Sequence, residues 1–260
     1  MTQIGDLDMA QSYDQREYEK KRADAYNATV GGLSGYDCKE CLNKGHILTV
    51  DNSGASAVRD CECMAIRRTL KRMEKSGLKD LLTDCTFDTF RTDSSWQAYA
   101  KQAALSYLED YRGNWFFAGG QVGAGKTHLC TAIVGELLKQ GLSARYMLWR
   151  DETVSLKAVI TDDEVYSMAI TALKEVEILY IDDFLKTEKG KYPTTADINI
   201  AFELLNYRYN RRELVTLISS ERPIDNILEI DEAVGSRIYQ RTKKYCIVIE
   251  YDRAKNYRLQ

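Results

Sequence analysis

The 260-residue sequence has no long hydrophobic run and no excess of basic residues. No apolar stretch approaches the roughly 20 residues that span a bilayer, and the polar, acidic N-terminus does not resemble a signal peptide. We therefore expect a cytoplasmic protein with no membrane partner. The 36 basic and 39 acidic residues leave a net charge of −3. Any binding of nucleic acid must therefore depend on local basic patches rather than on a global positive field.

Proline is scarce as well, with only Pro193 and Pro223, and this favours a compact fold dense in helices and strands. The apolar fraction of 44% and the charged fraction of 29% are typical of a globular protein. The length suits one large core with a small appendage. Seven cysteines are present. In a cytoplasmic chain they indicate metal binding or plain burial rather than disulfides.

The most informative motif is the glycine-rich segment Gly120–Thr127, which matches the phosphate-loop pattern G-x-x-x-x-G-K-[ST] at every fixed position. An expected strand at 114–118 precedes it, and an expected helix at 128–139 follows it. In this context main-chain amides and a helix N-terminus surround the phosphates of ATP. We expect Lys126 at the β- and γ-phosphates and Thr127 at Mg²⁺. The predicted nucleotide-binding residues of this segment are Gly120, Gln121, Val122, Gly123, Ala124, Gly125, Lys126, Thr127 and His128.

A second motif, Ile178–Asp183, is an apolar strand that ends in two carboxylates, which is typical of a Walker B motif. We expect Asp182 to hold the Mg²⁺ shell and Asp183 to orient or deprotonate the attacking water. A turn-capping role for Asp183 is the alternative.

Ser220 and Glu221 follow the next expected strand, at 214–219. In a parallel sheet, polar groups at this end of a strand face the ligand crevice. Either residue is therefore a candidate to sense the γ-phosphate or to position water. The alternative is that both only open the turn before Pro223.

Two cysteine pairs, Cys38-x-x-Cys41 and Cys61-x-Cys63, are spaced suitably for a tetrahedral Zn²⁺ site. His46 is close enough in sequence to replace one cysteine. A module this small has too little apolar content to fold alone, so we expect bound metal to supply its stability. The other cysteines are expected in the core: Cys85, Cys130 and Cys246.

Strand-like and helix-like segments alternate from about residue 86 onward, which is typical of an α/β domain. We expect strands at 114–118, 143–149, 177–181, 214–219 and 245–250. The chain then divides into a helical, flexible N-terminal segment at 1–35, a zinc-binding module with a basic linker helix at 36–80, and a nucleotide-binding domain at 81–260.

Two clusters of basic residues can follow a phosphate backbone, although most basic helix faces are only solvated. The first comprises Arg67, Arg68, Lys71, Arg72, Lys75 and Lys79, and the second comprises Lys186, Lys189 and Lys191.

Further segments bear arginines. An expected helix at Gly235–Arg241 presents Arg237 and Arg241 one turn apart, and Asn256-Tyr257-Arg258 lies near the end of the sequence. Together with the two nucleotide motifs and Ser219-Ser220, these segments resemble the DnaC/DnaI-type helicase loaders. Those loaders are AAA+ ATPases closely related to the IstB transposition helpers. The resemblance covers the chain from about residue 80, and the cysteine region resembles the zinc module of the DnaI-like branch.

The resemblance implies an AAA+ P-loop fold with a five-stranded parallel sheet and a reduced lid, and it implies hydrolysis of ATP. It implies that Arg241, or Arg237, acts as an arginine finger on an adjacent subunit, and that Arg258 contacts the γ-phosphate within its own subunit. The family commonly has Asn at the first sensor, where this sequence has Glu221. The implied partners are a hexameric DnaB-type replicative helicase and single-stranded DNA, with a homo-oligomer formed on the helicase during initiation of DNA replication.

Three other functions fit parts of the pattern. An IstB-like transposition helper, which delivers a transposase to target DNA, would normally lack the cysteine module. A P-loop kinase of a small metabolite would bind donor phosphates with a lid arginine inside one subunit. A zinc-dependent DNA-binding adaptor with an inactive ATPase is disfavoured by Lys126, Thr127 and Asp182, but Glu221 at the sensor position leaves it open.

Overall fold

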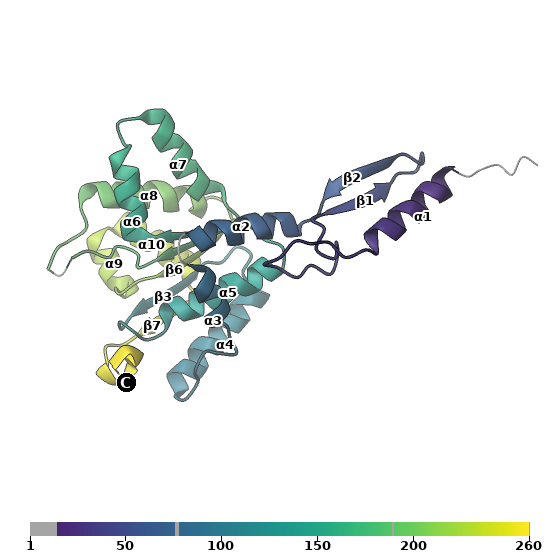
Figure 1. Ribbon diagram of the computed structural model, residues 1–260. Coiled ribbons are helices and arrows are strands. Elements are labelled where there is room, and N and C mark those ends of the chain that lie inside the picture. Colours follow the sequence, from purple (N-terminus) through teal and green to yellow (C-terminus); the bar gives the residue numbers. More distant parts are fainter. Residues whose placement is uncertain (1–14, 76–77, 189, 260) are drawn as a thin grey trace, which may run out of the picture. The chain divides into compact units, whose positions relative to one another are not determined.

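The computed structural model describes residues 15–75, 78–188 and 190–259 (Figure 1). The chain forms two compact units, Met1–Arg68 and Thr69–Gln260, and the division falls within helix α2 (Cys63–Lys75). The boundaries expected at residues 35 and 80 differ from this division and stay a prediction.

The first unit contains a helix and a two-stranded hairpin. Helix α1 (Gln15–Asn27) packs on strand β1 (His46–Val50), which pairs antiparallel with β2 (Ser56–Asp60). The Asn27 amide joins helix and strand, because it donates to Leu48 O at 2.9 Å and accepts from Leu48 N at 3.1 Å. The sequence indicated helical tendency in this region, but the hairpin was not predicted.

The second unit is built on a five-stranded sheet, as the sequence predicted. Its strands in spatial order are β4, β5, β6, β3 and β7, and every pairing is parallel. Each strand overlaps its expected range: β3 (Phe116–Gly120), β4 (Ala144–Leu148), β5 (Ile178–Asp182), β6 (Val215–Ser219) and β7 (Cys246–Ile249).

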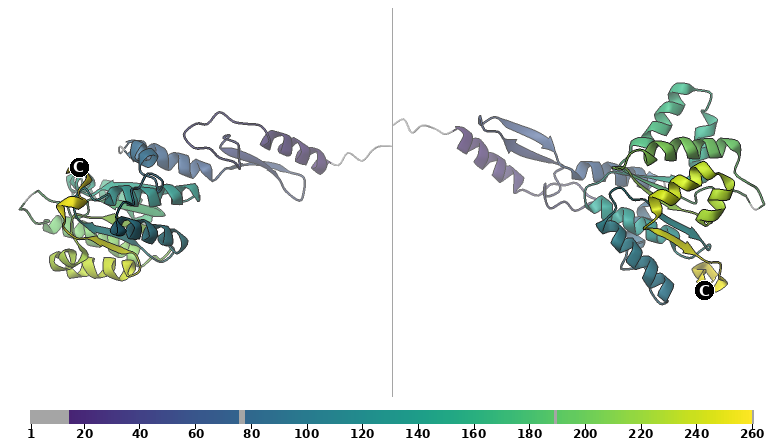
Figure 2. Two further views of the ribbon diagram at one scale, coloured as in Figure 1. Left: turned by 90° about the horizontal axis from the view of Figure 1, so that it is seen from below. Right: turned by 180° about the vertical axis from the view of Figure 1, so that it is seen from behind.

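Helices cover both faces of this sheet (Figures 1 and 2). Helix α5 packs against α3 and α4 on one face, and α8 and α10 pack together on the other, with α6 and α7 beside α8. The helices are α3 (Leu78–Asp84), α4 (Ser95–Glu109), α5 (Lys126–Lys139), α6 (Trp149–Ala158), α7 (Asp163–Glu175), α8 (Thr195–Tyr209), α9 (Ile224–Ile230) and α10 (Glu232–Thr242).

The lid is reduced, as expected. In the part of the chain that the structure describes, only two 3-10 turns follow β7, at Arg253–Lys255 and Tyr257–Leu259. No helix among the described residues is long and apolar enough to cross a membrane.

Burial on both faces explains why the central strands are continuous apolar runs in the sequence. All five residues of β5 and of β6 are buried, since helices cover both faces of the sheet. The strand register places Ile181 beside Ile218 and Ala118 beside Ser219. The carboxyl ends of β5, β6 and β3 therefore meet at one edge, and β6 lies between the other two.

A buried arginine supports the opposite end of the sheet. The fully buried Arg208 guanidinium donates to carbonyls at the end of α7, among them Lys174 O at 2.9 Å and Val176 O at 2.8 Å. Its Nε donates to Thr216 Oγ1 at 2.9 Å. Burial lowers the pKa of Arg208 to about 9. The side chain thus satisfies helix-end carbonyls that would otherwise be unpaired.

Candidate nucleotide-binding site

The phosphate loop joins β3 to α5 in a conformation that requires glycine. Gly120, Gly123 and Gly125 have φ values of +97°, +71° and +83°, a region that L side chains rarely adopt. A cavity of about 510 Å³ lies against this loop. Its lining includes Val122, Gly123, Ala124, Gly125, Lys126, Thr127, His128, Asp182, Asp183, Lys186, Glu221 and Arg258.

Lys126 is held inside its own loop. Its Nζ donates to Gly120 O at 2.8 Å and to Gln121 O at 2.7 Å, and the residue is only 7% exposed. Burial lowers the pKa of Lys126, and the carboxylates of Glu221, Asp183 and Asp182 oppose that shift. Gly120 and Gln121, which were predicted to bind nucleotide, therefore position this ammonium group and do not line the cavity.

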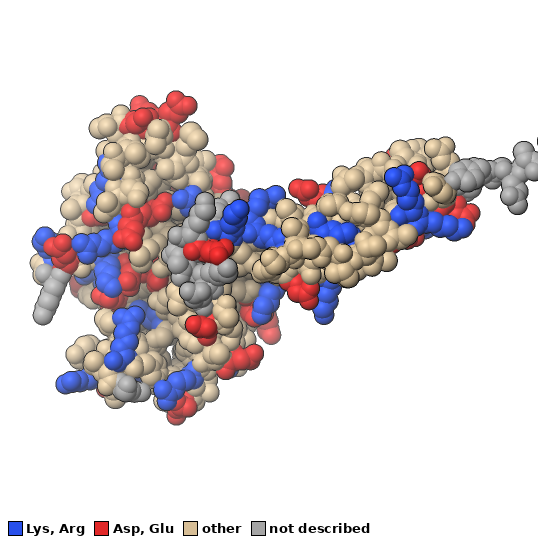
Figure 3. All heavy atoms as spheres, viewed as in Figure 1, with Lys and Arg blue, Asp and Glu red and all other residues tan. Residues whose placement is uncertain are grey.

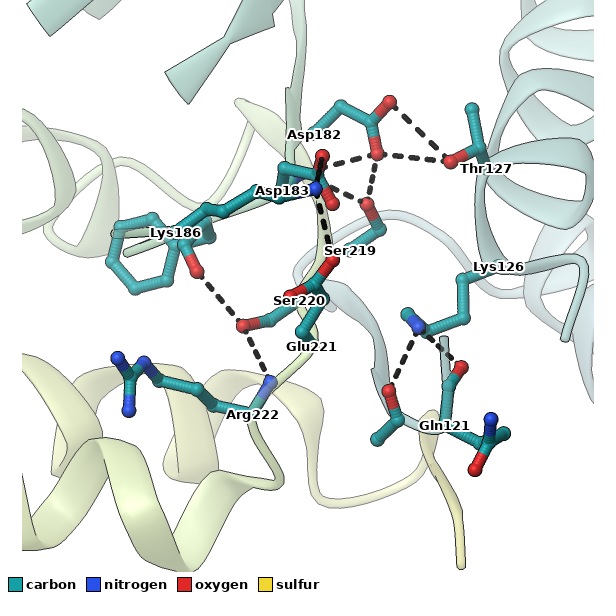
Figure 4. Close-up of polar contacts among 12 residues, drawn as sticks. Gln121, Lys126, Thr127, Asp182, Asp183, Lys186, Ser219, Ser220, Glu221 and Arg222 are labelled. Carbon is teal, nitrogen blue, oxygen red and sulfur yellow. Dashed lines mark hydrogen bonds and ion pairs between the residues drawn. The ribbon is translucent and has the colours of Figure 1, made fainter. Parts of the chain in front are cut away.

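The buried Asp182 carboxylate joins three strands and one helix at the sheet edge (Figure 4). It accepts hydrogen bonds from Thr127 Oγ1 at 3.2 Å, from Tyr146 OH at 3.0 Å and from the Ser219 hydroxyl. Burial, together with the Asp182 charge, raises the pKa of Tyr146. The hydroxyl of Thr127 and the carboxylate of Asp182 form an oxygen-donor pair that suits Mg²⁺. Sequence reasoning missed Tyr146, which lies on β4, because nothing in its local pattern indicates a polar partner.

Asp183 lies in a strained turn directly after β5. Its φ is +53°, and Leu185 in the same turn has a φ of +56°. Its carboxylate faces the cavity and pairs with Lys186 Nζ at 2.8 Å. The same Nζ lies 2.8 Å from Glu221 Oε1. Sequence reasoning placed Lys186 among DNA-contacting residues and missed both contacts, although its spacing three residues after Asp183 is a usable signal.

The two sensor candidates face opposite ways. Ser220 is fully buried, donates to Phe184 O at 2.8 Å, and accepts from Arg222 N at 3.1 Å (Figure 4). It does not line the cavity, whereas Glu221 does. Ser220 therefore points away from the cavity that Glu221 lines, because successive residues of an extended segment point to opposite sides, and its expected role as a sensor stays a prediction.

The segment that follows β7 is docked on the phosphate loop. Tyr257 N donates to Gly123 O at 3.0 Å, and a Cβ on Gly123 would lie 2.0 Å from Asn256 Oδ1. The Tyr257 ring stacks on Trp96 with centroids 6.4 Å apart. This docking brings Arg258 to the cavity, and sequence reasoning did not predict the contact of Asn256 with the loop.

His128 lines the cavity and contacts the segment that precedes α4. Its Nε2 lies 2.9 Å from Thr86 O, and its ring contacts the edge of Phe90 at a centroid distance of 5.2 Å. The segment 84–90 therefore packs on the start of α5. Cys85, which was expected in the core, is partly exposed and lines the same cavity, whereas Cys130 is buried.

Neither candidate arginine finger lines the cavity of its own subunit. The Arg241 guanidinium lies over the Trp115 ring, 5.4 Å from its centroid, at the amino end of β3 and away from the phosphate loop. The residue is 7% exposed, and its Nε and Nη2 have no hydrogen-bond partner among the described residues. Burial lowers the pKa of Arg241. Arg237 Nε donates to Asn206 Oδ1 at 2.9 Å.

The four cysteines of the first unit converge. Their Sγ atoms all lie within 4.8 Å of one another, with 3.7 Å between Cys38 and Cys61 and 3.5 Å between Cys41 and Cys63. A tetrahedral Zn²⁺ with Zn–S bonds near 2.3 Å places its sulfurs about 3.8 Å apart, so the cluster fits such an ion. His46 is not part of this cluster, because its ring stacks on Tyr26 and its Nε2 pairs with the Tyr26 hydroxyl.

The basic clusters are largely engaged in local contacts. Arg67 donates to Ser34 O at 2.6 Å and to Tyr36 O at 2.7 Å, and Lys191 pairs with Glu188 at 2.6 Å. Basic and acidic groups are interspersed over the visible face of the second unit (Figure 3). Lys189 and the side chains of Arg72, Lys75 and Lys79 lie outside the described part of the chain.

Comparisons with known protein sequences find a family and several relatives. The family of IstB-like ATP binding proteins matches residues 56–260. The Bacillus subtilis protein YqaM, which is named as uncharacterized, is 36% identical over 77% of this chain and 66% of its own length. The phage-like element PBSX protein XkdC of the same organism is 32% identical over 84% of each chain. The replicative helicase loader DnaC of Escherichia coli is 27% identical over 73% of this chain and 74% of its own.

Two solved structures share the fold. The crystal structure of the DnaC helicase loader superposes with a TM-score of 0.54 at 17% identity, over 66% of this chain and 98% of that one. The crystal structure of DnaI gives a TM-score of 0.53 at 20% identity, over 66% and 93% of the two chains. These likenesses confirm the fold class expected from the sequence.

Substitution of Lys126 tests the site directly. Lys126→Ala is expected to weaken ATP binding at least about a hundredfold, since it removes an ammonium that makes charge-assisted contacts with phosphate. Equilibrium titration with a fluorescent ATP analogue measures the change. Lys139→Ala, at the exposed end of the same helix, is the matched control. Unchanged affinity in Lys126→Ala would contradict the assignment of the phosphate loop.

Proposed function

Because the chain belongs to the IstB-like ATP-binding protein family and is an AAA+ P-loop ATPase, we propose that it loads a hexameric DnaB-type replicative helicase onto single-stranded DNA. The observation that carries the proposal is an intact nucleotide site in one unit combined with a four-thiol cluster in the other. The alternative is a transposition helper that delivers a transposase to target DNA, which would normally lack the cysteine cluster. We place the protein in the cytoplasm.

The proposed site uses ATP and Mg²⁺ with distinct roles for each side chain. Thr127 and Asp182, already 3.2 Å apart, would hold Mg²⁺, which neutralises charge between the β- and γ-phosphates. Lys126 exchanges its two carbonyl partners for phosphate oxygens. Asp183, at the cavity wall, orients the attacking water and accepts its proton. Arg258 contacts the γ-phosphate within the same subunit.

Capture experiments test the partner. We expect the helicase of the host or of a resident phage to be retained on the immobilised protein in the presence of ATP, with a changed yield in its absence. A transposase offered in parallel should not be retained. Retention of the transposase and not of the helicase, under both nucleotide conditions, would favour the transposition helper and contradict helicase loading.

We propose that the four cysteines bind one Zn²⁺. The buried cluster around these thiols adds only Ile47, with Tyr36 packed against it, so apolar burial there supplies little stability. Metal binding would supply the missing free energy of folding. The Gly45 N–H, 3.2 Å from Cys41 Sγ, is a donor suited to a thiolate ligand.

Metal analysis tests this assignment. About one equivalent of zinc per chain should co-purify, and the double variant Cys38→Ser/Cys41→Ser should lose it, because two sulfur ligands are removed. The first unit should then become sensitive to proteolysis. Cys246→Ser, which changes a thiol outside the cluster, should keep its zinc. A metal-free protein with a protease-resistant first unit would refute the assignment.

We propose that Arg241 acts on the nucleotide of an adjacent subunit within a homo-oligomer formed on the helicase. Support comes from its unpaired, buried Nε and Nη2 atoms, since a buried guanidinium without partners is costly. At 7% exposure the side chain must rotate outward to reach a neighbour. Arg237 is the second candidate, although its Nε is already engaged by Asn206.

Mixing experiments distinguish action across subunits. Arg241→Ala is expected to lower the ATPase rate about a hundredfold or more with nearly unchanged ATP affinity. Mixing it with Asp183→Asn should restore part of the rate, because mixed oligomers combine an intact arginine with an intact acid. Arg212→Ala, at an exposed position nearby, is the control. Failure to restore activity at any mixing ratio would exclude the adjacent-subunit role.

A further inference from the structure

An acidic side chain occupies the position between the phosphate loop and the Walker B turn. Strand β6 lies between β3 and β5, so the residues after β6 emerge between the two nucleotide motifs. The residue that lines the cavity there is Glu221. A carboxylate cannot donate a hydrogen bond to a phosphate, and it repels a phosphate that approaches closely. Glu221 therefore needs a compensating positive charge if a triphosphate is to bind.

Lys186 supplies that charge from a separate segment (Figure 4). Its Nζ lies 2.8 Å from Glu221 Oε1 and 2.8 Å from Asp183 Oδ2, and its side chain lines the same cavity. Burial lowers the pKa of Lys186, but hydrogen bonds to the two carboxylates outweigh it and raise the pKa overall. The group is thus a protonated ammonium that faces the cavity between two acids.

The turn that carries Lys186 is hydrogen-bonded to the end of β6. Phe184 N donates to Ser219 O at 2.8 Å, and the Ser220 hydroxyl donates to Phe184 O at 2.8 Å. Arg222 Nε donates to Leu185 O at 3.3 Å. These three bonds join the turn to the end of β6 and support its positive φ angles. The turn that carries Lys186 is therefore joined to the strand end that carries Glu221, and Ser220 contributes to this connection from the buried side.

We propose that Lys186 contacts the γ-phosphate and distinguishes ATP from ADP, and that Glu221 positions its ammonium for this contact. The proposal deepens the nucleotide site of the proposed function and rests on it. When the ammonium shifts toward the γ-phosphate, its bond to Asp183 weakens. The Asp183 carboxylate then becomes available to the attacking water, which couples recognition of the triphosphate to hydrolysis.

Affinities for a non-hydrolysable ATP analogue and for ADP, both with Mg²⁺, test the contact. Lys186→Met should weaken binding of the triphosphate at least about tenfold, because the contact of the ammonium with the γ-phosphate is lost and Glu221 is left unpaired beside that phosphate. ADP affinity should stay within about twofold, since ADP has no γ-phosphate. Lys139→Met is the matched control, because Lys139 also pairs with an acid three residues earlier, Glu136, away from the cavity.

Two further variants separate recognition from structural support. The double variant Lys186→Met/Glu221→Gln should recover only part of the lost triphosphate affinity, since the repelling charge is gone but the ammonium contact is still missing. Lys186→Arg should keep the preference for triphosphate. An equal loss for ATP analogue and ADP would show a purely structural role, and unchanged affinities would show no contact; either result overturns the proposal. These affinity measurements use the isolated protein, so their outcome does not depend on whether the protein binds a helicase. Failure of this proposal can therefore be distinguished from failure of the proposed helicase-loading function.

Discussion

The position of one buried carboxylate constrains the whole nucleotide-binding unit. Asp182 is at the end of β5 and accepts hydrogen bonds from the phosphate-loop helix, from β4 and from β6. A buried carboxylate is costly unless its lone pairs have donors. A shift in the register of any of these strands would remove a donor. The parallel sheet, the loop conformation and the contact of Thr127 with Asp182 are therefore determined together.

The charge balance of the cavity follows from this arrangement. Three acids, Asp182, Asp183 and Glu221, line a site suited to an anion, and the lysines that face them have different partners. Lys126 bonds to main-chain carbonyls, so it can exchange them for phosphate without exposing an acid. Lys186 forms ion pairs with two acids, so its movement leaves both carboxylates without that partner. The first lysine suits binding, and the second suits coupling of binding to chemistry.

The two units differ in what stabilises them. The second unit has large apolar side chains such as Trp115, Phe117 and Leu204 fully buried, so hydrophobic burial is a main source of its stability. The buried cluster of the first unit consists mainly of cysteine side chains, with Ile47 as its apolar member. The turn of this unit at Leu42 and Asn43 has positive φ values at non-glycine residues, which a metal-bound loop can support. The proposed metal would therefore stabilise the first unit and leave the second unaffected.

Local sequence was sufficient to predict much of the site. The phosphate loop, the Walker B strand and the four cysteines are short-range patterns whose residue types are dictated by backbone geometry or ligand chemistry, and the structure brings each set together. The five strands were predictable because burial on both faces leaves uninterrupted apolar runs. The β1–β2 hairpin was missed, since all five residues of β2 are exposed and leave little hydrophobic signal.

Contacts between distant segments were not predictable in the same way. The pairing of Lys186 with Glu221, the bond from Tyr146 to Asp182 and the docking of Asn256 on Gly123 each join segments that are far apart in the chain. The sequence by itself determined which segments have the phosphate-loop and Walker B patterns and which residues are able to ligate metal, because those properties depend on neighbouring residues. Tertiary structure alone decided that Glu221 and not Ser220 faces the cavity, because the strand order and the direction of each side chain arise only when the sheet is assembled.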